Sequence, residues 1–143
     1  MIHAFLCAGR TPVTIQAHSH LKYEEDIKRA YKQYWPTEPP QNEYLYGIVY
    51  YFHKKKNSID ADNLCKPIFD ALKNELYPDD KLIKYVRSAV YDLDSNNIET
   101  LDLTKMPDNV SDDFIKNLNN VDDMLYIEIG NLDFGMFEFA CER

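Results

Sequence analysis

Apolar residues recur at helical spacing in two parts of the chain. Between residues 20 and 34 they fall on one face of a helix: Tyr23, Ile27, Ala30, Tyr31 and Tyr34. A second such face begins at residue 64: Leu64, Ile68, Ala71, Leu72 and Leu76. We expect the first helix to span 20–34 and to end before Pro36, and the second to span 63–76 with Asn63 as its N-cap.

Segments rich in aromatic and β-branched residues predict strands around these helices. The most apolar one, residues 44–52, reads YLYGIVYYF and is expected in the interior of a sheet. Further strands are predicted over 2–7, 13–17, 82–93 and 124–129, with an additional candidate over 136–140. A short helix capped by Ser111 is predicted over 111–120. This order is typical of an α+β fold, here a small single domain over residues 1–143 with a mixed β-sheet flanked by helices.

The composition fits one folded domain. The chain has 143 residues, of which 45% are hydrophobic and 13% aromatic, enough for a sizeable core. No apolar run reaches the roughly 18 residues of a membrane-spanning helix, and the N-terminus lacks the pattern of a signal peptide. Cys7, Cys65 and Cys141 are odd in number and far apart, which favours free thiols over a disulfide framework. We therefore expect a cytoplasmic protein with no membrane partner.

Charge is distributed unevenly along the chain. The net charge of −8 argues against a general nucleic-acid binder, but residues 1–91 carry a net +2 and residues 92–143 a net −10. Exposed charges are screened beyond roughly 8–10 Å, so a local basic rim can contact DNA while an acidic lobe lies elsewhere. The candidates for this rim are Lys54, Lys55, Lys56, Lys73, Lys84 and Arg87. The alternative is that these residues only solvate the surface. The acidic stretch 92–123 is interpreted as a candidate insertion.

The segment SIDADNLCKPIFDALKNELYPDDKLI, residues 58–83, concentrates acidic residues around the second predicted helix. Asp60 and Asp62 are two residues apart, so their side chains point to the same side of an extended segment. Asp62, Lys66 and Asp70 follow at intervals of four, roughly along one face of a helix. The helix start therefore combines two carboxylates with a lysine.

Three carboxylates and a lysine suit the hydrolysis of a phosphodiester. Asp80, in the turn after the helix, can join Asp60 and Asp62 only if the chain folds back. Carboxylates are the ligands that Mg²⁺ prefers, and the ion polarises a phosphate and activates water. Lys66 can stabilise the negative charge that develops on the phosphate.

Each of these residues also has an ordinary structural interpretation. Asp62 suits the N-terminus of a helix, where the dipole favours an acid. Lys66 and Asp70 fit a surface ion pair worth about 0.3–0.5 kcal/mol. Asp79 and Asp80 are common residues in a turn. Only the combination of all these residues favours a site over scattered acids.

The stretches DADNLCKPIFDAL and YPDDKLI together resemble the RusA-like Holliday junction (crossover junction) endodeoxyribonuclease family. The family pattern is D-x-D-N-x-x-K-x-x-x-D-A-L followed by a D-D pair about a turn after the helix. All its fixed positions are present: Asp60, Asp62, Asn63, Lys66, Asp70, Ala71, Leu72, Asp79 and Asp80. The resemblance implies a small α+β homodimer that cuts four-way DNA junctions with Mg²⁺, for which Mn²⁺ can substitute. Its paired nicks leave 5′-phosphate and 3′-hydroxyl ends, in DNA recombination and repair, without a small-molecule cofactor.

The resemblance also implies residue roles. Asp60, Asp62 and Asp80 correspond to the metal-binding carboxylates, and Lys66 corresponds to the catalytic lysine. Asp70 is expected to anchor the helix by pairing with Lys66. Two alternatives stay open: a catalytically weak or inactive module that binds branched DNA, and an interaction protein that uses the acidic residues 92–143. A flap or another branched DNA is an alternative substrate.

Overall fold

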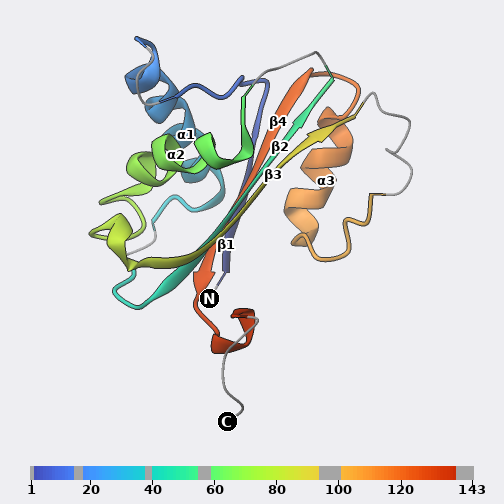
Figure 1. The fold of residues 1–143 in the computed structure, drawn as a ribbon. Helices are drawn as coiled ribbons and strands as arrows, with labels where there is room; N and C mark the ends of the chain where they lie inside the picture. The colour runs from blue at the N-terminus through green and yellow to red at the C-terminus, as the bar shows by residue number, and fades with distance from the viewer. Residues whose placement is uncertain (1, 15–17, 38–39, 55–58, 94–100, 138–143) are drawn as a thin grey trace.

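The fold is α+β, as predicted, and is built on one four-stranded mixed sheet with three helices (Figure 1). The computed structural model describes residues 2–14, 18–37, 40–54, 59–93 and 101–137. The strands are β1 (Ile2–Ala8), β2 (Leu45–His53), β3 (Ile83–Asp92) and β4 (Asp123–Asn131). The helices are α1 (His20–Tyr34), α2 (Cys65–Leu72) and α3 (Asp108–Asn117). Short 3₁₀ turns span η1 (Ala61–Asn63), η2 (Asp80–Leu82) and η4 (Phe134–Met136).

The sheet has the strand order β1-β4-β2-β3. β4 runs antiparallel to both β1 and β2, whereas β2 and β3 are parallel. A parallel pair needs a crossover connection, and here the crossover consists of η1, α2 and η2. The prediction that residues 44–52 form an interior strand is confirmed. The acidic motif thus lies in the crossover that joins the only parallel pair of these four strands.

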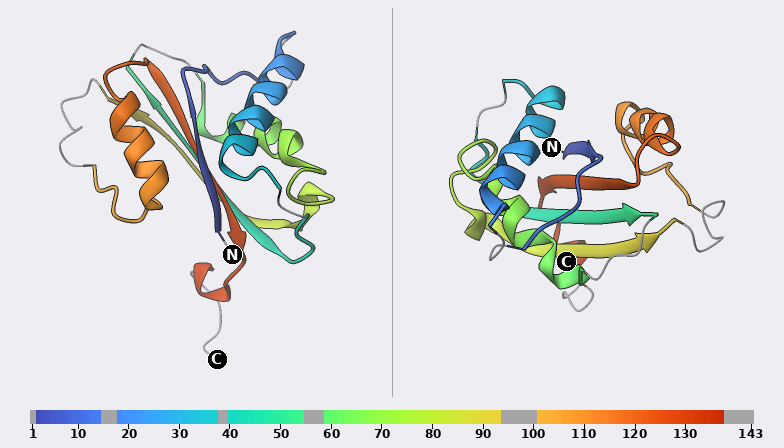
Figure 2. Two further views of the ribbon diagram at one scale, coloured as in Figure 1. Left: turned by 180° about the vertical axis from the view of Figure 1, so that it is seen from behind. Right: turned by 90° about the horizontal axis from the view of Figure 1, so that it is seen from above.

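Helices cover both faces of the sheet. The views of Figures 1 and 2 show α1 and α2 on one face and α3 on the other. Side chains of β2 alternate between the two layers: Val49 and Tyr51 pack towards α1 and α2, and Phe52 packs towards α3. Among the described ranges, no helix has the length and apolar character needed to cross a membrane.

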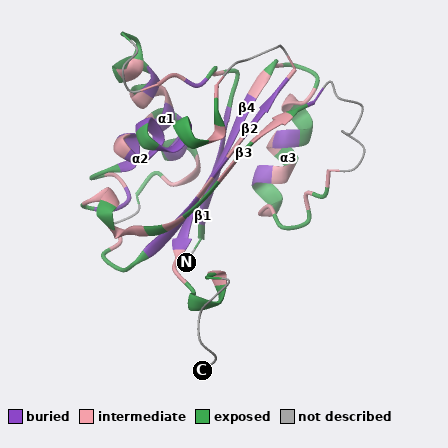
Figure 3. Ribbon diagram, viewed as in Figure 1, coloured by how far each residue is buried: buried purple, intermediate pink, exposed green. Residues whose placement is uncertain are grey.

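Burial falls sharply from the interior strands to β3. β2 and β4 are mostly buried, whereas no residue of β3 is buried, as Figure 3 shows in pink and green. The opposite edge strand, β1, is protected by α1: Trp35 Nε1 donates a hydrogen bond to the Ala4 carbonyl over 3.1 Å. Tyr34, at the end of α1, also donates a hydrogen bond to Asp113 of α3. Trp35 therefore covers part of the β1 edge, and the edge at β3 is the more exposed one.

The first helix matches its prediction from His20 to Tyr34. The second is shorter than the predicted 63–76, because residues 61–63 form the turn η1 and the helix begins only at Cys65. Asn63 is therefore not its N-cap, and Pro67 lies in its first turn, where a missing N–H is tolerated. The helix stops at Leu72, and Asn74 adopts a left-handed φ of 69°, which asparagine tolerates better than most residues.

Three other predicted elements differ from the structure. Val13 and Thr14 are not in a strand, and the remainder of the predicted strand 13–17 lies outside the described residues. Helix α3 starts at Asp108 after Pro107, and Ser111 lies inside it with its hydroxyl donating to the Asp108 carbonyl. Of the candidate strand 136–140, Met136 closes η4 and residues 138–140 lie outside the described residues. The predicted strands 2–7, 82–93 and 124–129 are confirmed with small shifts at their ends.

Gly47 of β2 allows α2 to approach the sheet closely. A Cβ at this position would lie 2.5 and 2.9 Å from ring atoms of Phe69 on α2. We predict that Gly47→Ala lowers the free energy of unfolding by about 1–3 kcal/mol, because the ring has to move within a packed core. Urea denaturation measures the change. Gly135→Ala is the control, since the nearest neighbour of its Cβ would be Asp133 Oδ1 at 3.4 Å. Equal stability of the two variants would contradict the close approach.

Candidate active site

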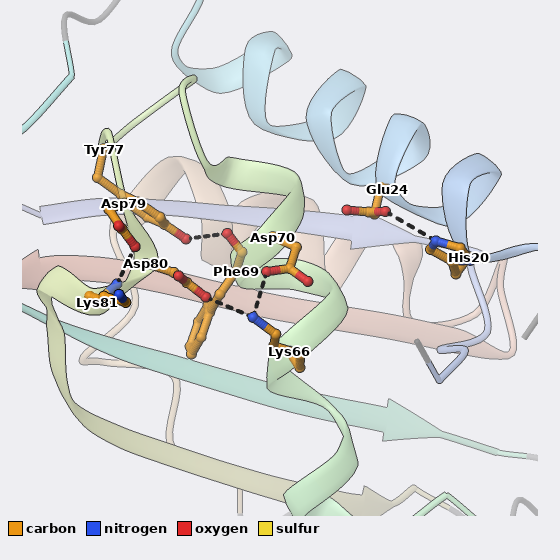
Figure 4. A network of polar contacts seen from close by, with 9 residues as sticks. All are labelled: His20, Glu24, Lys66, Phe69, Asp70, Tyr77, Asp79, Asp80 and Lys81. Atoms are coloured by element: carbon orange, nitrogen blue, oxygen red, sulfur yellow. Dashed lines mark hydrogen bonds and ion pairs between the residues drawn. The ribbon is translucent and has the colours of Figure 1, made fainter. Parts of the chain in front are cut away.

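Lys66 joins the two ends of the acidic motif. Its ammonium nitrogen lies 2.9 Å from Asp70 Oδ1 on the same helix and 3.1 Å from Asp80 Oδ2 on η2 (Figure 4). The expected pairing of Lys66 with Asp70 is confirmed, and Asp80 does fold back to α2. The lysine side chain is 60% exposed, against 25% for Asp70 and 23% for Asp80. The result is an ammonium group held between two carboxylates at the protein surface.

The segment between α2 and η2 is folded tightly enough to bring Asp80 back. Tyr77 is fully buried, and its hydroxyl donates a 2.6 Å hydrogen bond to the Phe69 carbonyl of α2. The Asn74 amide donates to the Tyr77 carbonyl over 2.6 Å, which closes the loop. Asp79 then caps η2 by accepting a hydrogen bond from the Lys81 amide at 2.9 Å. These contacts place Asp80 at the start of η2, within reach of Lys66.

Neighbouring groups and burial shift the pKa values of several side chains around the site. Hydrogen bonds to Asp70 and then to Asp80 raise the pKa of Lys66 above its usual value, so the ammonium stays charged throughout the neutral range. Its favourable interactions are complete below the ordinary lysine pKa and are lost only as pH rises through the raised value. The hydrogen bond from the Lys81 amide lowers the pKa of Asp79. Burial, and secondarily the charges of Asp80 and Asp70, raise the pKa of Tyr77, which keeps its hydroxyl protonated as a donor.

Asp60 and Asp62 lie at the turn η1, outside the contact of Lys66 with Asp70 and Asp80. Asp60 precedes η1 in an extended conformation, Asp62 lies within the turn, and both side chains are exposed. The Ser88 hydroxyl of β3 donates a 2.8 Å hydrogen bond to the Ala61 carbonyl, which fixes η1 against the open edge of the sheet. Because Asp62 precedes α2, it does not share a helix face with Lys66.

The structure gathers only part of the predicted site. Lys66, Asp70 and Asp80 are in contact, whereas no group of three or more His, Cys, Asp or Glu side chains within the described ranges could hold a metal ion. The predicted set Asp60, Asp62 and Asp80 therefore does not surround one point here. Oxygen donors of the right kind are present, but their placement is not that of a complete metal centre.

The predicted basic rim is dispersed. The Lys54 ammonium donates a hydrogen bond to the carbonyl of Leu118, the residue after α3. Lys55 and Lys56 lie outside the described residues. Lys73 is exposed directly after α2. On β3 the other two point to different faces. Lys84 lies 5.3 Å from the centre of the Tyr44 ring, and Arg87 lines a hollow on the face that α3 covers in part. The described members do not form one continuous surface.

Two residues that position the site were missed by sequence reasoning. Tyr77 was predicted only as part of a turn, although a large aromatic residue beside Leu76 in a polar loop is a signal of burial. Ser88 offered no signal, because its bond to Ala61 depends on how the crossover folds. Cys65 of α2 is buried, and burial raises the pKa of its thiol to about 11.

The hydrogen bond from Tyr77 to α2 gives a prediction about stability. Phe69 is one of the last four residues of α2, whose carbonyls lack partners inside the helix. We predict that Tyr77→Phe lowers the free energy of unfolding by about 1–3 kcal/mol, because a buried acceptor loses its donor. Thermal and urea denaturation measure it. Tyr44→Phe is the control, since Tyr44 is 62% exposed, and the prediction fails if both variants are as stable as the parent.

Comparison with known proteins agrees with the motif. Residues 7–100 match the family model described as Endodeoxyribonuclease RusA, whereas no curated protein matches the chain. The matched range covers more than half of the chain and contains α1, β2, α2 and β3 with the whole acidic motif. RusA-family proteins are crossover junction endodeoxyribonucleases, and they generally use Mg²⁺. This chain belongs to the RusA endodeoxyribonuclease family.

Proposed function

We propose that this protein is a Mg²⁺-dependent endonuclease that resolves four-way DNA junctions by paired nicks, in DNA recombination and repair. Family membership implies a Holliday junction resolvase-like nuclease and a branched DNA substrate. The observation that carries the proposal for this chain is the exposed Lys66 ammonium held between Asp70 and Asp80 at the family motif. A scattered set of surface acids would not require a folded-back loop with a buried tyrosine to support it.

Lys66 is suited to meet a phosphate. A lysine ammonium has three N–H donors, and the two carboxylates Asp70 and Asp80 account for two of them. The third donor is available for a non-bridging phosphate oxygen, where negative charge develops during hydrolysis. The two acceptors restrict the position of the ammonium before substrate arrives, so less ordering is needed in the reaction. In this role Lys66 is the catalytic cation, and Asp70 is a positioning residue.

Mg²⁺ is the proposed cofactor, with Mn²⁺ as a substitute of the same ligand preference. By motif position its ligands are Asp60, Asp62 and Asp80. The donor chemistry fits, because exposed carboxylate oxygens suit a hard cation. The arrangement of these side chains does not fit a metal ion, since no three such groups within the described parts of the chain gather around one point. An ion held by these carboxylates would supply Lewis acidity at the phosphate.

A homodimer in the cytoplasm completes the proposal. A four-way junction has near two-fold symmetry, and paired nicks require two active sites related in the same way, which a symmetric dimer supplies. Cys7 and Cys65 are free and buried, which suits a reducing compartment. Burial raises the pKa of each of these thiols to about 11, so both are inert as nucleophiles near neutral pH.

The test is cleavage of a labelled synthetic four-way junction by the purified protein. We expect symmetric nicks with Mg²⁺, none with EDTA, and a loss of about 10²-fold or more for Lys66→Gln, which removes the charged donor. Asp62→Asn should lose activity to a similar extent if it is a metal ligand. Glu75→Gln is the matched control. Glu75 pairs with Lys32 near the end of α2, away from Lys66, and its change should leave the rate unaltered.

Linear duplex and a flap substrate are tested in parallel. Faster cleavage of the flap would show that the flap, and not the junction, is the preferred substrate. The protein would still be a nuclease. If folded, dimeric protein cuts none of these DNAs but binds the junction, the chain is an inactive branched-DNA-binding module. Full activity of Lys66→Gln would contradict the assigned role of the lysine.

A further inference from the structure

One carboxylate on α1 is surrounded by three cations. Asp26 lies 2.9 Å from Arg10 Nε, 3.6 Å from Lys22 Nζ and 3.0 Å from Arg29 Nη1. A single negative charge cannot neutralise three positive ones, so this cluster carries an excess of positive charge in a chain whose net charge is −8. Unlike the predicted basic rim, it brings residues from two segments to one place.

The hydrogen-bonding capacity of this cluster is not exhausted by Asp26. The Nε–H of Arg10 is buried and close to Asp26, but it is not aligned for a hydrogen bond and has no acceptor among the described residues. The side chains of Lys22 and Arg29 are 64% and 62% exposed, so their charged groups face solvent. Lys22 and Arg29 therefore offer N–H donors to a ligand that accepts hydrogen bonds.

A hollow of about 460 Å³ lies beside the cluster, between α1 and α3 at the end of β1. Arg10, Arg29 and Lys116 supply positive charge to its lining, against Asp26 and Asp113. Asp113 accepts a hydrogen bond from Tyr34, and the three cations of the lining outnumber its two carboxylates. The lining thus has a positive excess, and Lys22, which contacts the lining residue Asp26, adds to it.

The cluster occupies a different flank of α1 from the one facing the nuclease motif. Helix residues advance by about 100° each, so Lys22 and Arg29 lie roughly half a turn around α1 from His20. Figure 4 draws His20 and Glu24 on the part of α1 that borders α2 and Lys66. A single phosphate cannot occupy both places, whereas a duplex arm carries many phosphates spread along its length.

We propose that Arg10, Lys22, Arg29 and Lys116 form a phosphate-binding surface that holds the DNA backbone away from the cleaved bond. The proposal rests on the proposed function, since branched DNA supplies the phosphates. Exposed cations on α1 and α3, together with the half-buried Arg10 after β1, suit an extended polyanion better than an enclosed small anion. Such contacts fix the register of a nucleic acid without reading its sequence.

The experiment compares two pairs of substitutions on one helix. Lys22→Gln with Arg29→Gln removes two charges from the cluster, and Lys28→Gln with Lys32→Gln removes two from elsewhere on α1. Binding of a fluorescent four-way junction is measured in EDTA at several salt concentrations. We expect the cluster pair to weaken binding about tenfold at low salt and to reduce the slope of log K against log salt by about 2. The control pair should leave the slope close to that of the parent.

Two further measurements separate the outcomes. Near-parental cleavage of the junction by the cluster pair at saturating protein would show that the nuclease is intact and only binding has changed. Equal slopes for the two pairs, both folded by circular dichroism, would overturn the phosphate surface while leaving the nuclease untouched. NMR titration with inorganic phosphate tests whether the surface binds a free small anion instead of the phosphates of DNA. Shifts at Arg10 with phosphate, combined with parental DNA binding by the cluster pair, would show a small-anion site and overturn the proposal.

Discussion

The contact of Lys66 with both Asp70 and Asp80 is the interaction on which the candidate site depends. It connects α2 to the turn η2 that follows it. Lys66 and Asp80, 14 residues apart, are thereby brought into contact beside Asp70. Without the lysine, the two carboxylates would face each other with unbalanced charge. With it, the protein presents a fixed ammonium at the surface. Such exposed ion pairs contribute little to folding stability, and the role that we propose for this contact is catalytic.

The fold supports this contact through the crossover between β2 and β3. Close approach of Phe69 to Gly47 seats α2 on the sheet, and the bond from Ser88 to Ala61 fixes η1 against β3. β3 is the open edge of the sheet and has no buried residue, so the crossover it supports borders an accessible surface. A large, rigid substrate such as branched DNA requires that access, whereas a small substrate is usually enclosed. The positive cluster around Asp26 lies on the other flank of α1, where we propose that it binds phosphates of the same DNA.

The sequence predicts the parts of this structure that depend on local periodicity. α1 matched from His20 to Tyr34 because one apolar face defines it, and β2 was placed in the sheet interior because its run is apolar on both faces. The start of α2 was missed because Asn63 is a good N-cap and the chain instead forms a 3₁₀ turn there. The return of Asp80 depends on the buried Tyr77, and the cluster at Asp26 depends on Arg10 from another segment. Such tertiary contacts leave no spacing signal.

The most direct test of this account is the pKa of Lys66, measured by NMR of its labelled side chain in the parent, in Asp70→Asn and in Asp80→Asn. We expect a pKa above the ordinary lysine value of about 10.4 in the parent, because both carboxylates favour the charged ammonium. We expect a lower pKa in each variant, since each removes one negative partner. A Lys66 that titrates at the ordinary value in all three proteins would show that the lysine does not join the two carboxylates, and would contradict the site as described.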